Sequence, residues 1–313
     1  MIPDHIKADV FAQLGCQPSE AKLLGGYNNN VYEINRGKDI VVKIVDRSIV
    51  AESRVLAELE WLVYLNLHGL SVVRPVHLIG DTYIQPISDG YYLIAYDKVI
   101  GTPINSQESR VWNDELFGKW GEMMGKMHTL AKSYQAVHQR PQWFEQDLFN
   151  EEAFHSDPLL AGKWKQYHND LIALTTSKDS YGLIHGDLHQ HNLLLRDQEI
   201  TLLDFGDCEY NWFAYDIAIV MYHTAQTVPE GPHREKFIKS FFTSFMEGYT
   251  KENSTTSFVP QIDYFIDYRH FYSYAYHTAY ADKSQLTEAQ LRFLDEMRLS
   301  LINRDSYLGF SIK

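Results

Sequence analysis

The stretch Leu183–Asp207, LIHGDLHQHNLLLRDQEITLLDFGD, decides how this sequence folds around its polar residues. It carries an amide at Asn192 and carboxylates at Asp187, Asp204 and Asp207, separated by short apolar runs. The runs NLLL and ITLL are joined by RDQE, and a connection of this length predicts a β-hairpin. The pairing of the two strands therefore determines which polar side chains meet.

The register of this hairpin is expected to bring an amide and a carboxylate together. With the turn centred on the DQ dipeptide, counting back along both strands places Asn192 opposite Leu203, the residue before Asp204. Opposed residues of a hairpin have Cβ atoms about 4.5–5.5 Å apart. Asp187 lies five residues before Asn192, in the loop that leads into this end of the hairpin. We therefore expect three oxygen-bearing side chains to converge.

Oxygen ligands of this kind suit a hard cation. Mg²⁺ usually binds proteins through one or two carboxylates and completes its shell with phosphate oxygens and water. Asn192 and Asp204 fit that role, which leaves Asp187 to accept a proton from a hydroxyl group. The constellation therefore favours chemistry on a phosphate-bearing substrate with an alcohol as the attacking group.

Length, composition and charge limit the class of protein. The chain has 313 residues, 45% hydrophobic and 22% charged, with a net charge of −13. These values are typical of a globular protein with room for two domains or two lobes. The negative charge disfavours nucleic acid and anionic membranes as partners. Cys16 and Cys208 cannot form a framework of several disulfides, which favours a reducing, cytoplasmic setting.

No segment of the sequence has the pattern of a signal peptide or a membrane span. The N-terminus lacks a basic region followed by an apolar one. The longest apolar-rich stretch, WFAYDIAIVMYHTA from Trp212, carries Asp216 and falls short of the ~20 residues that cross a bilayer. We expect it to form a buried helix.

Hydrophobic periodicity divides the chain into a β-rich first third and an α-rich remainder. Two strand-like runs flank the RGKD turn at residues 36–39, and a helix over residues 48–68 precedes Gly69, a predicted C-cap. Three further strand-like runs follow, up to about Gly101. Helical patterns begin at 114, 212, 234, 262 and about 287. This order predicts an α+β protein in two lobes.

The motif HGDLHQHN followed by LLDFGD resembles the catalytic loop and metal motif of the protein-kinase-like superfamily. The HGD form resembles its small-molecule branch, which contains aminoglycoside phosphotransferases, choline kinases, homoserine kinases and hydroxylysine kinases. The resemblance implies a two-lobed protein-kinase-like fold, with residues 1–97 as nucleotide-binding lobe and 98–313 as catalytic and acceptor-binding lobe. It implies ATP and Mg²⁺ as cofactors, Asp187 as catalytic base, and Asn192 and Asp204 as metal ligands.

The same resemblance assigns the remaining nucleotide contacts to the first lobe and the hairpin. Lys43 lies in the apolar strand IVVKIV and would contact the phosphates while pairing with Glu58, or alternatively with Glu60. The turn GGYNNN would approach the phosphates, and IAYDKVIG resembles the hinge that meets adenine. The implied nucleotide-binding residues are Gly26, Asn28, Asn30, Val41, Lys43, Glu58, Asp97, Val99, Leu194 and Leu203.

These motifs predict an ATP- and Mg²⁺-dependent phosphotransferase that acts on a hydroxyl of a small molecule. The acidic residues Asp187, Asp207 and Glu209 favour an acceptor that carries an amine, as aminoglycosides, choline, homoserine and hydroxylysine do. Arg269, in a tyrosine-rich helix, would bind an acceptor carboxylate or cap a buried acid. We expect Asp216 to brace the catalytic loop.

Three alternatives remain open at this point. An atypical protein kinase would need an activation segment, which the sequence lacks because a helix follows DFGD almost at once. A non-catalytic nucleotide-binding regulator would be expected to have lost at least one of Lys43, Asp187, Asn192 and Asp204. A zinc hydrolase would use His185, His189 and His191, but HxxxH binds zinc in this way on a helix, whereas we predict a loop. His185 is expected instead to shape the loop by bonding to its backbone.

Overall fold

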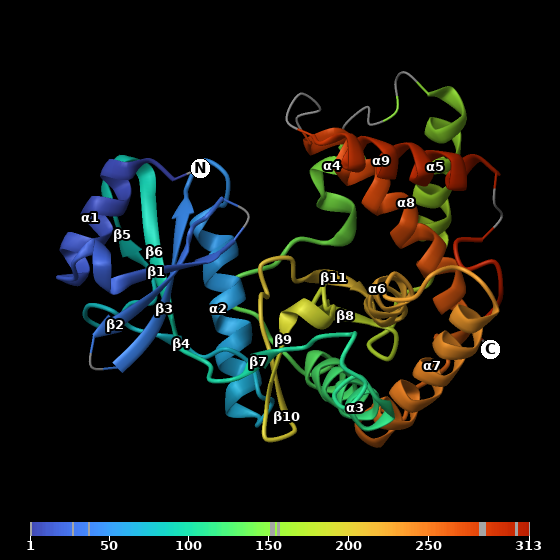
Figure 1. Ribbon diagram of the computed structural model, residues 1–313, viewed down its shortest axis with the longest axis horizontal. Helices are drawn as coiled ribbons and strands as arrows, with labels where there is room; N and C mark the ends of the chain where they lie inside the picture. Colours follow the sequence, from blue (N-terminus) through green and yellow to red (C-terminus); the bar gives the residue numbers. More distant parts are fainter. Residues whose placement is uncertain are drawn as a thin grey trace. The chain divides into compact units, whose positions relative to one another are not determined.

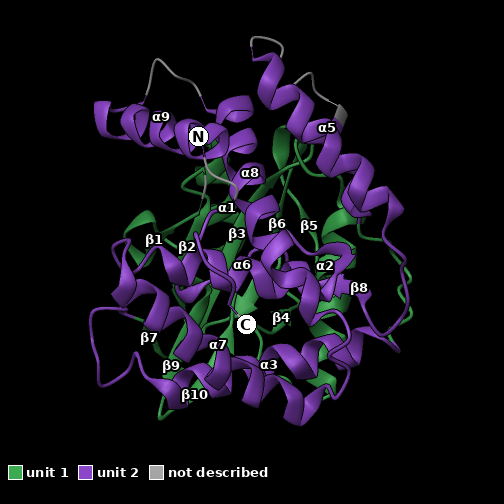
Figure 2. Cartoon of the chain, turned by 90° about the vertical axis from the view of Figure 1, so that its right-hand side faces the viewer, with its two compact units in different colours: residues 1–104, 134–140, 191–206 green, residues 105–133, 141–190, 207–313 purple. Residues whose placement is uncertain are grey.

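The computed structural model describes residues 2–26, 28–36, 38–150, 154, 157–281, 286–303 and 306–312. The chain forms two compact units, coloured separately in Figure 2. Unit 1 comprises residues 1–104, 134–140 and 191–206, and unit 2 comprises residues 105–133, 141–190 and 207–313. The chain therefore returns to unit 1 twice. Assignment of the nucleotide function to residues 1–97 stays a prediction.

Unit 1 is built on an antiparallel sheet with the strand order β1-β2-β3-β6-β4, and β5 also pairs with β6 (Figure 1). The strands are β1 Ala21–Gly25, β2 Val31–Arg36, β3 Lys38–Asp46, β4 Pro75–Val76, β5 Gln85–Pro86 and β6 Tyr91–Asp97. The helices of this unit are α1 Asp4–Leu14 and α2 Glu52–Leu67, and Gly69 adopts a φ of 73° just after α2. This left-handed residue confirms the predicted end of the helix.

The two faces of the unit 1 sheet have different partners. Val42 and Ile44 are fully buried in a core that includes Ile6 and Val10 of α1. Lys43 lies between them in sequence and therefore projects from the opposite face. Tyr96 of β6 pairs with Val41 and so shares that opposite face, and its hydroxyl donates to Glu58 of α2. Lys43 and Glu58 thus lie on the same side of the sheet.

The hairpin predicted from the sequence forms within unit 1. It consists of β9 Leu193–Arg196 and β10 Glu199–Leu202, and β7 Thr102–Pro103 adds a third strand. Asp197 and Gln198 both have positive φ values, 50° and 67°, as a two-residue type I′ turn requires. The amide of Leu203 donates a 2.9 Å hydrogen bond to the carbonyl of Asn192. The predicted register is therefore confirmed.

Unit 2 is mainly helical and contains one two-stranded sheet, β8 Tyr181–Ile184 with β11 Glu209–Trp212. Its helices are α3 Asp114–Ala131, α4 Asp147–Asn150, α5 Pro158–Ala173, α6 Phe213–Ala225, α7 Pro232–Glu252, α8 Ile262–Tyr280 and α9 Glu288–Asn303. Short 3-10 turns, distributed over both units, are η1 Pro18–Glu20, η2 Ser88–Gly90, η3 Trp143–Glu145, η4 Gln190–Asn192 and η5 Val259–Gln261.

Helix α6 is the buried helix predicted from the apolar stretch after Trp212. Almost all of its side chains are buried, including the carboxylate of Asp216, which is fully inaccessible. Helices α3 and α7 pack so closely that a Cβ atom on Gly121 would lie 1.9 Å from the carbonyl oxygen of Phe245. Glycine is therefore required at this crossing, which fixes α3 against α7 beside β8.

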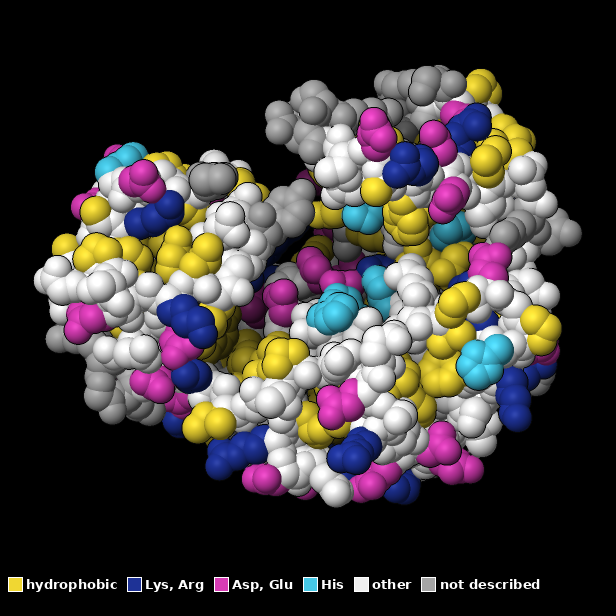
Figure 3. Space-filling view, viewed as in Figure 1, with side chains coloured by type: hydrophobic (Ala, Val, Ile, Leu, Met, Phe, Trp, Pro, Cys, Tyr) yellow, Lys and Arg dark blue, Asp and Glu magenta, His cyan; other side chains and the backbone are white. Residues whose placement is uncertain are grey.

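Charged side chains of both signs are interspersed over the face shown in Figure 3, as is usual for a globular surface. Among the helices in the described parts of the chain, none has the length and apolar character needed to cross a membrane.

Candidate active site

Unit 1 brings together Lys43 and Asp204, two residues that the sequence assigned to one site. The Nζ atom of Lys43 lies 3.9 Å from Oδ1 of Asp204, and the aspartate side chain is 63% exposed. A Cβ atom on Gly206 would lie 3.4 Å from that oxygen and 3.6 Å from Nζ. Glycine at this position therefore keeps space open beside the lysine–carboxylate pair.

The structure gives the two candidate partners of Lys43 different surroundings. Glu58 is buried, and its Oε1 accepts a 3.1 Å hydrogen bond from Tyr96 on the Lys43 side of the sheet. Glu60 instead accepts hydrogen bonds from the amide and the ring of His138, at 3.0 and 2.6 Å. This arrangement supports Glu58 over Glu60, and the Lys43–Glu58 pair stays a prediction.

Asn30, the last residue of the GGYNNN motif, is bound to strand β3. Gly26 has a φ of 85°, and a Cβ atom there would lie 2.3 Å from Oδ1 of Asn30. The side chain of Asn30 donates a 2.8 Å hydrogen bond to the carbonyl of Ile44, and the amide of Ile44 donates back to Asn30. Asn30 therefore anchors the turn next to Lys43. Phosphate contacts by Gly26, Asn28 and Asn30 stay predictions.

The predicted adenine contacts also lie in unit 1. Asp97 ends β6, where its amide donates to the carbonyl of Arg74 and its carboxylate pairs with the Arg74 guanidinium. A Cβ atom on Gly101, just beyond Val99, would lie 3.1 Å from the Cβ of Leu194. The segment after β6 is thus packed on the hairpin. Val41, Val99, Leu194 and Leu203 are all half-buried.

Arg140 is a part of unit 1 that the sequence pattern did not reveal. Its side chain is buried and donates to the carbonyl of Arg54 at 2.9 Å and to the carbonyl of Gly206. It therefore ties the start of α2 to the segment that carries Asp204. An isolated arginine in an irregular segment gives no sequence signal for such a role.

Unit 2 contains the predicted catalytic aspartate. Asp187 follows β8, and Asp207 precedes β11, so the antiparallel pairing places both at the same end of the two-stranded sheet. Gly186 has a φ of 83°, and a Cβ atom there would lie 2.3 Å from the carbonyl oxygen of Asp207. The glycine of HGD is thus required both by its backbone conformation and by the close approach of a second segment.

Asp216 holds the backbone of the HGD segment from within the core. Its two carboxylate oxygens accept hydrogen bonds from the amides of His185 and Gly186, at 3.0 and 3.1 Å. His128 contacts it through Nε2 at 3.0 Å, and burial keeps the pKa of His128 low, so the neutral ring donates to the carboxylate. Burial opposes the charge of Asp216, but these donors lower its pKa. This geometry agrees with a bracing role.

His185 shapes the loop, as expected from its position before Asp187. Its ring is fully buried, and Nδ1 accepts a 3.3 Å hydrogen bond from the amide of Asp187. Across the residues that the structure describes, no three His, Cys, Asp or Glu side chains are grouped as a metal site. The histidines of this segment therefore give no support to the zinc alternative.

One arginine and two histidines lie close to the carboxylate of Asp187. Arg269 of α8 donates through Nη2 to Oδ1 at 2.7 Å. Nε2 of His223, from α6, lies 3.9 Å from the same oxygen, and Nε2 of His189 lies 3.4 Å from Oδ2. Burial would raise the pKa of Asp187, but His189 and Arg269 hold it well below its ordinary value. Asp187 is therefore a carboxylate at neutral pH.

The other two acids near this segment differ from each other. Glu209 is buried, and its oxygens accept hydrogen bonds from the side chains of Asn211, at 2.7 Å, and Gln146. Asp207 is exposed. Glu209 is therefore held inside unit 2 by hydrogen bonds, whereas Asp207 is the acid of the two that is exposed.

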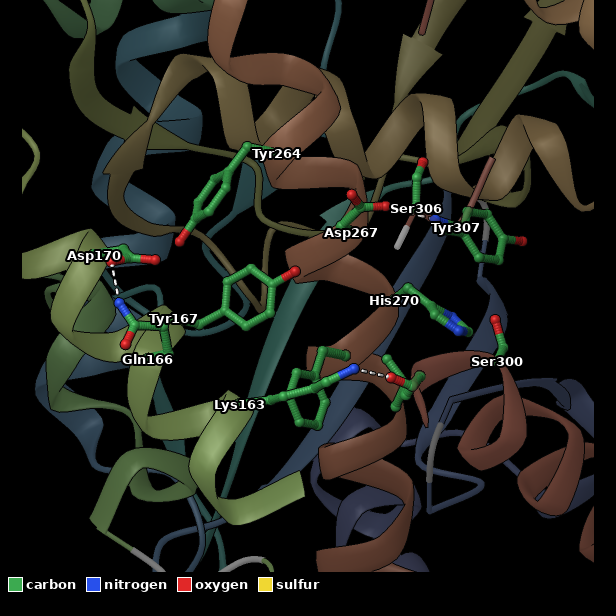
Figure 4. Close-up of a pocket in the computed structure, with 12 residues that line it drawn as sticks. Lys163, Gln166, Tyr167, Asp170, Tyr264, Asp267, His270, Ser300, Ser306 and Tyr307 are labelled. Carbon is green, nitrogen blue, oxygen red and sulfur yellow. Dashed lines mark hydrogen bonds between the residues drawn. The ribbon is translucent and has the colours of Figure 1, made fainter. Parts of the chain in front are cut away.

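A separate cavity of about 310 Å³ lies within unit 2, lined by α5, α8, α9 and residues 306–307 (Figure 4). Asp267 of α8 lies in its wall and accepts a 2.6 Å hydrogen bond from the amide of Tyr307. Burial raises the pKa of Asp267 to about 6. None of the lining residues is one to which the sequence assigned a site role.

The chain is similar to known proteins over most of its length. The profile of a family described as "Phosphotransferase enzyme family" matches residues 20–249. An amicoumacin kinase of Bacillus subtilis (strain 168) is 28% identical over 320 residues, which cover 98% of this chain and 94% of that protein. The solved structure of an amicoumacin kinase in complex with AMP-PNP, Ca²⁺ and Ami aligns with a TM-score of 0.89 and 26% identity, over 99% of both chains.

A microcompartment-associated aminopropanol kinase shares the fold at a TM-score of 0.74, with 18% identity, over 98% of this chain and 99% of that one. These matches confirm the α+β, protein-kinase-like fold expected from the sequence.

Proposed function

The chain belongs to the phosphotransferase enzyme family, and from this we propose that it transfers the γ-phosphoryl group of ATP, with Mg²⁺, to a hydroxyl of a small, amine-bearing molecule. The coarser part of this statement, a kinase that acts on a small hydroxyl-bearing molecule, follows from the family and from the similarity to amicoumacin kinase. The nucleotide, the metal and the amine are the proposed parts.

The observation that carries the proposal is the ionised state and placement of Asp187. It is the aspartate of HGD, its loop is fixed by Asp216, and its neighbours hold it as a carboxylate. A carboxylate at this position accepts a hydrogen bond from the acceptor hydroxyl and receives its proton as the oxygen attacks phosphorus. Because its pKa is low, Asp187 is a weak base that takes up the hydroxyl proton late in the reaction. Its main contribution is therefore to orient the hydroxyl.

The donor side of the reaction is assigned to unit 1. Lys43 would contact the phosphates, and Asn192 and Asp204 would hold Mg²⁺ with one amide and one carboxylate oxygen. This donor set is what Mg²⁺ prefers when phosphate and water complete its shell, and Gly206 leaves room beside it. Bound Mg²⁺ would neutralise the phosphate charge. The relative of known structure was solved with AMP-PNP and Ca²⁺, which supports a nucleotide and a divalent ion here.

A screen for ADP release tests the proposal. Purified protein, ATP and Mg²⁺ should release ADP with at least one acceptor from a panel of amicoumacin, aminopropanol, choline, hydroxylysine, homoserine and aminoglycosides. The product should carry one phosphate by mass spectrometry. The amine assignment would be overturned if the protein phosphorylated acceptors that lack an amine and did not phosphorylate any acceptor that carries one.

The Asp187→Ala variant separates catalysis from binding. It should bind ATP with Mg²⁺ as the wild type does, because its side chain is not among the assigned nucleotide ligands, and its turnover should fall by about 10² or more. Full activity in this variant would show that Asp187 is not the base.

Two other functions make different predictions in these assays. A non-catalytic nucleotide-binding regulator would show a thermal shift with ATP and no turnover with any acceptor. A protein kinase would phosphorylate casein-like substrates and none of the small molecules. The lysine, the asparagine and both aspartates of the motif are present, which favours the enzyme over the regulator.

A further inference from the structure

Arg269 makes two of its polar contacts with the loop that carries Asp187. Its Nη2 donates to Oδ1 of Asp187 at 2.7 Å, and its Nη1 donates to the carbonyl of Gly186 at 3.4 Å. Its guanidinium also lies over the ring of Tyr272, 5.8 Å from the ring centre. The side chain is only 12% exposed, so this charge is largely removed from water. The burial of a charge in this way is costly unless its geometry is well satisfied.

His223 of α6 contacts the same guanidinium nitrogen that binds Asp187. Its Nε2 lies 3.3 Å from Nη2 of Arg269. Burial, followed by the charge of Arg269, lowers the pKa of His223 to about 3, so the ring is neutral and its Nε2 accepts from the guanidinium. Arg269, a residue of α8, is thus also held by α6. The guanidinium that donates to Asp187 is therefore fixed in position.

The two oxygens of Asp187 consequently have different environments. Oδ1 is engaged by the guanidinium, whereas Oδ2 faces His189 at 3.4 Å, and the aspartate side chain is 28% exposed. A fork-shaped donor that holds one oxygen also fixes the rotation of the carboxylate. We propose that Arg269 is a positioning residue for phosphoryl transfer, which holds Oδ1 so that Oδ2 meets the acceptor hydroxyl. This inference rests on the proposed function and adds a residue outside the motif.

The proposed transfer forms one bond at phosphorus and breaks another. The acceptor oxygen forms a bond to the γ-phosphorus, and the bond from that phosphorus to the bridging oxygen breaks, so that ADP leaves with the electron pair. The hydroxyl proton passes to Oδ2 of Asp187. Arg269 touches neither the phosphorus nor the hydroxyl in this scheme and acts through Asp187. A misplacement of about 1 Å in such a group can cost about 10² in rate.

The expected kinetic result follows from this indirect role. Arg269→Met should lower kcat by about 10²-fold and leave nucleotide affinity unchanged. Arg269→Lys, which keeps the charge but loses the fork, should lie between the wild type and Arg269→Met. In an Asp187→Asn background, Arg269→Met should change the residual kcat by less than about twofold, because both changes disable one unit.

The pH profile provides a second readout. The groups that face Asp187 and Arg269 are His189 from the loop, Tyr215 and His223 from α6, and Tyr272 from α8, with Asp207 and Glu209 nearby. In the wild type, kcat should show no acid limb from Asp187 above about pH 4. In Arg269→Met, which lacks the guanidinium, the pKa of Asp187 should rise. The loss of kcat in acid should therefore begin at a pH at least one unit higher than in the wild type.

Arg298 offers a matched control in the same unit. It forms a 2.6 Å ion pair with Asp157, so Arg298→Met removes an arginine–aspartate pair that is remote in sequence from the catalytic loop. This variant should keep both kcat and the pH profile of the wild type. Thermal melting with and without ATP and Mg²⁺ shows whether each variant is folded and binds nucleotide. If Arg269→Met does not fold, Arg269→Lys replaces it in the same double-mutant comparison.

The outcomes separate this inference from the function on which it rests. The positioning role would be overturned if Arg269→Met had the kcat of the wild type. It would also be overturned if Arg269→Met lowered kcat by the same factor in the wild type and in the Asp187→Asn background. A pH profile of kcat in Arg269→Met that matches the wild-type profile would also overturn the positioning role. Wild-type kcat in Asp187→Asn would instead overturn the assignment of Asp187 as base in the proposed function.

Discussion

The amide of Leu203 donates to the carbonyl of Asn192 at 2.9 Å, and this bond closes the open end of the β9–β10 hairpin. One residue further, the chain reaches Asp204, whose φ of 55° is uncommon for an aspartate. The backbone at Asn192 and at Asp204 is therefore fixed by strand pairing and by the turn that follows it. The role of both side chains as metal ligands stays a prediction.

Replacement of Asp204 by alanine should weaken nucleotide binding only when Mg²⁺ is present. Its carboxylate lies beside Lys43, and the proposal assigns it to the metal. We expect the Kd for ATP, measured by titration calorimetry, to rise at least about tenfold with Mg²⁺, since a charge-assisted contact contributes about 1.5–3 kcal/mol. Without Mg²⁺ the affinity should change little.

Glu199→Gln is a suitable control for this measurement, because it removes an exposed carboxylate from the same hairpin. The control should bind ATP as the wild type does in both conditions. Equal weakening of Asp204→Ala with and without Mg²⁺ would count against the assignment as a metal ligand.

Replacement of Asp216 by asparagine should destabilise unit 2 and reduce turnover. The amide nitrogen of asparagine would face an N–H donor, either at His185 or at Gly186, so a buried hydrogen bond would be lost. We expect a loss of about 3 kcal/mol in the free energy of unfolding, measured by urea denaturation. The kcat should fall because the loop of Asp187 is no longer braced.

The effect of Asp216 should also depend on pH. Its pKa is depressed in the folded protein, so the stability that it contributes is present above the unfolded pKa of about 3.9 and is lost as the pH falls through the folded value. The difference between wild type and Asp216→Asn should therefore shrink in acid. A constant difference from pH 7 to pH 3 would argue against a charged brace.

The sequence predicted these local relationships better than the distant ones. Strand alternation and a turn centred on Asp197 and Gln198 were enough to obtain the hairpin register, and roles for Asp187 and Asp216 could be proposed from their places along the sequence. The partner of Asp187 could not be assigned, because Arg269 lies 82 residues away in a tyrosine-rich helix whose pattern does not single it out. Of the two roles considered for Arg269 from the sequence, the capping of an acid resembles its contact with the half-buried Asp187, but the sequence did not identify which acid.

Other features were missed for similar physical reasons. Helix α1 has weak amphipathic patterning, and its place against the sheet depends on a core assembled from several strands. The strands β4 and β5 are only two residues long, although the sequence suggested longer runs. The requirement for Gly121 arises only when α3 meets α7. Such features depend on tertiary contacts, which sequence periodicity does not encode.

A comparison of two glycines should separate backbone strain from steric conflict in the catalytic loop. Gly186 and Gly309 have similar positive φ values, 83° and 76°, but a Cβ atom at Gly186 would meet the carbonyl of Asp207, whereas at Gly309 nothing lies within 4 Å. Gly309→Ala should cost about 1 kcal/mol from strain alone, and Gly186→Ala should cost at least about 2 kcal/mol more. Thermal unfolding followed by circular dichroism measures both.

Activity adds a second test to this comparison. Gly186→Ala should also lower kcat, because the HGD backbone must move away from Asp207, while Gly309→Ala should retain it. Similar losses of stability in the two variants would show that the contact between the two segments is looser than the structure indicates.

The cavity in Figure 4 leads to a prediction about stability rather than catalysis. The pKa of Asp267 rises from 3.8 to about 6 because the carboxyl group is buried, with Asp263 nearby. A group whose folded pKa is raised stabilises the protein fully below the unfolded pKa, and this contribution is lost as the pH rises through the folded one. The wild type should therefore lose up to about 3 kcal/mol between pH 4 and pH 7 from this group, at 1.36 kcal/mol per pKa unit.

Asp267→Asn tests this directly, because asparagine keeps an oxygen that can accept from the amide of Tyr307 but cannot ionise. At pH 7.5 the variant should be more stable than the wild type in urea unfolding, and at pH 4 the two should be nearly equal. Asp170→Asn, in the wall of the same cavity, is the control, since it should leave the pH dependence in place. If Asp267→Asn were less stable than the wild type at pH 7.5, ionised Asp267 would stabilise the folded protein. Burial would then not be the main influence on the pKa of Asp267.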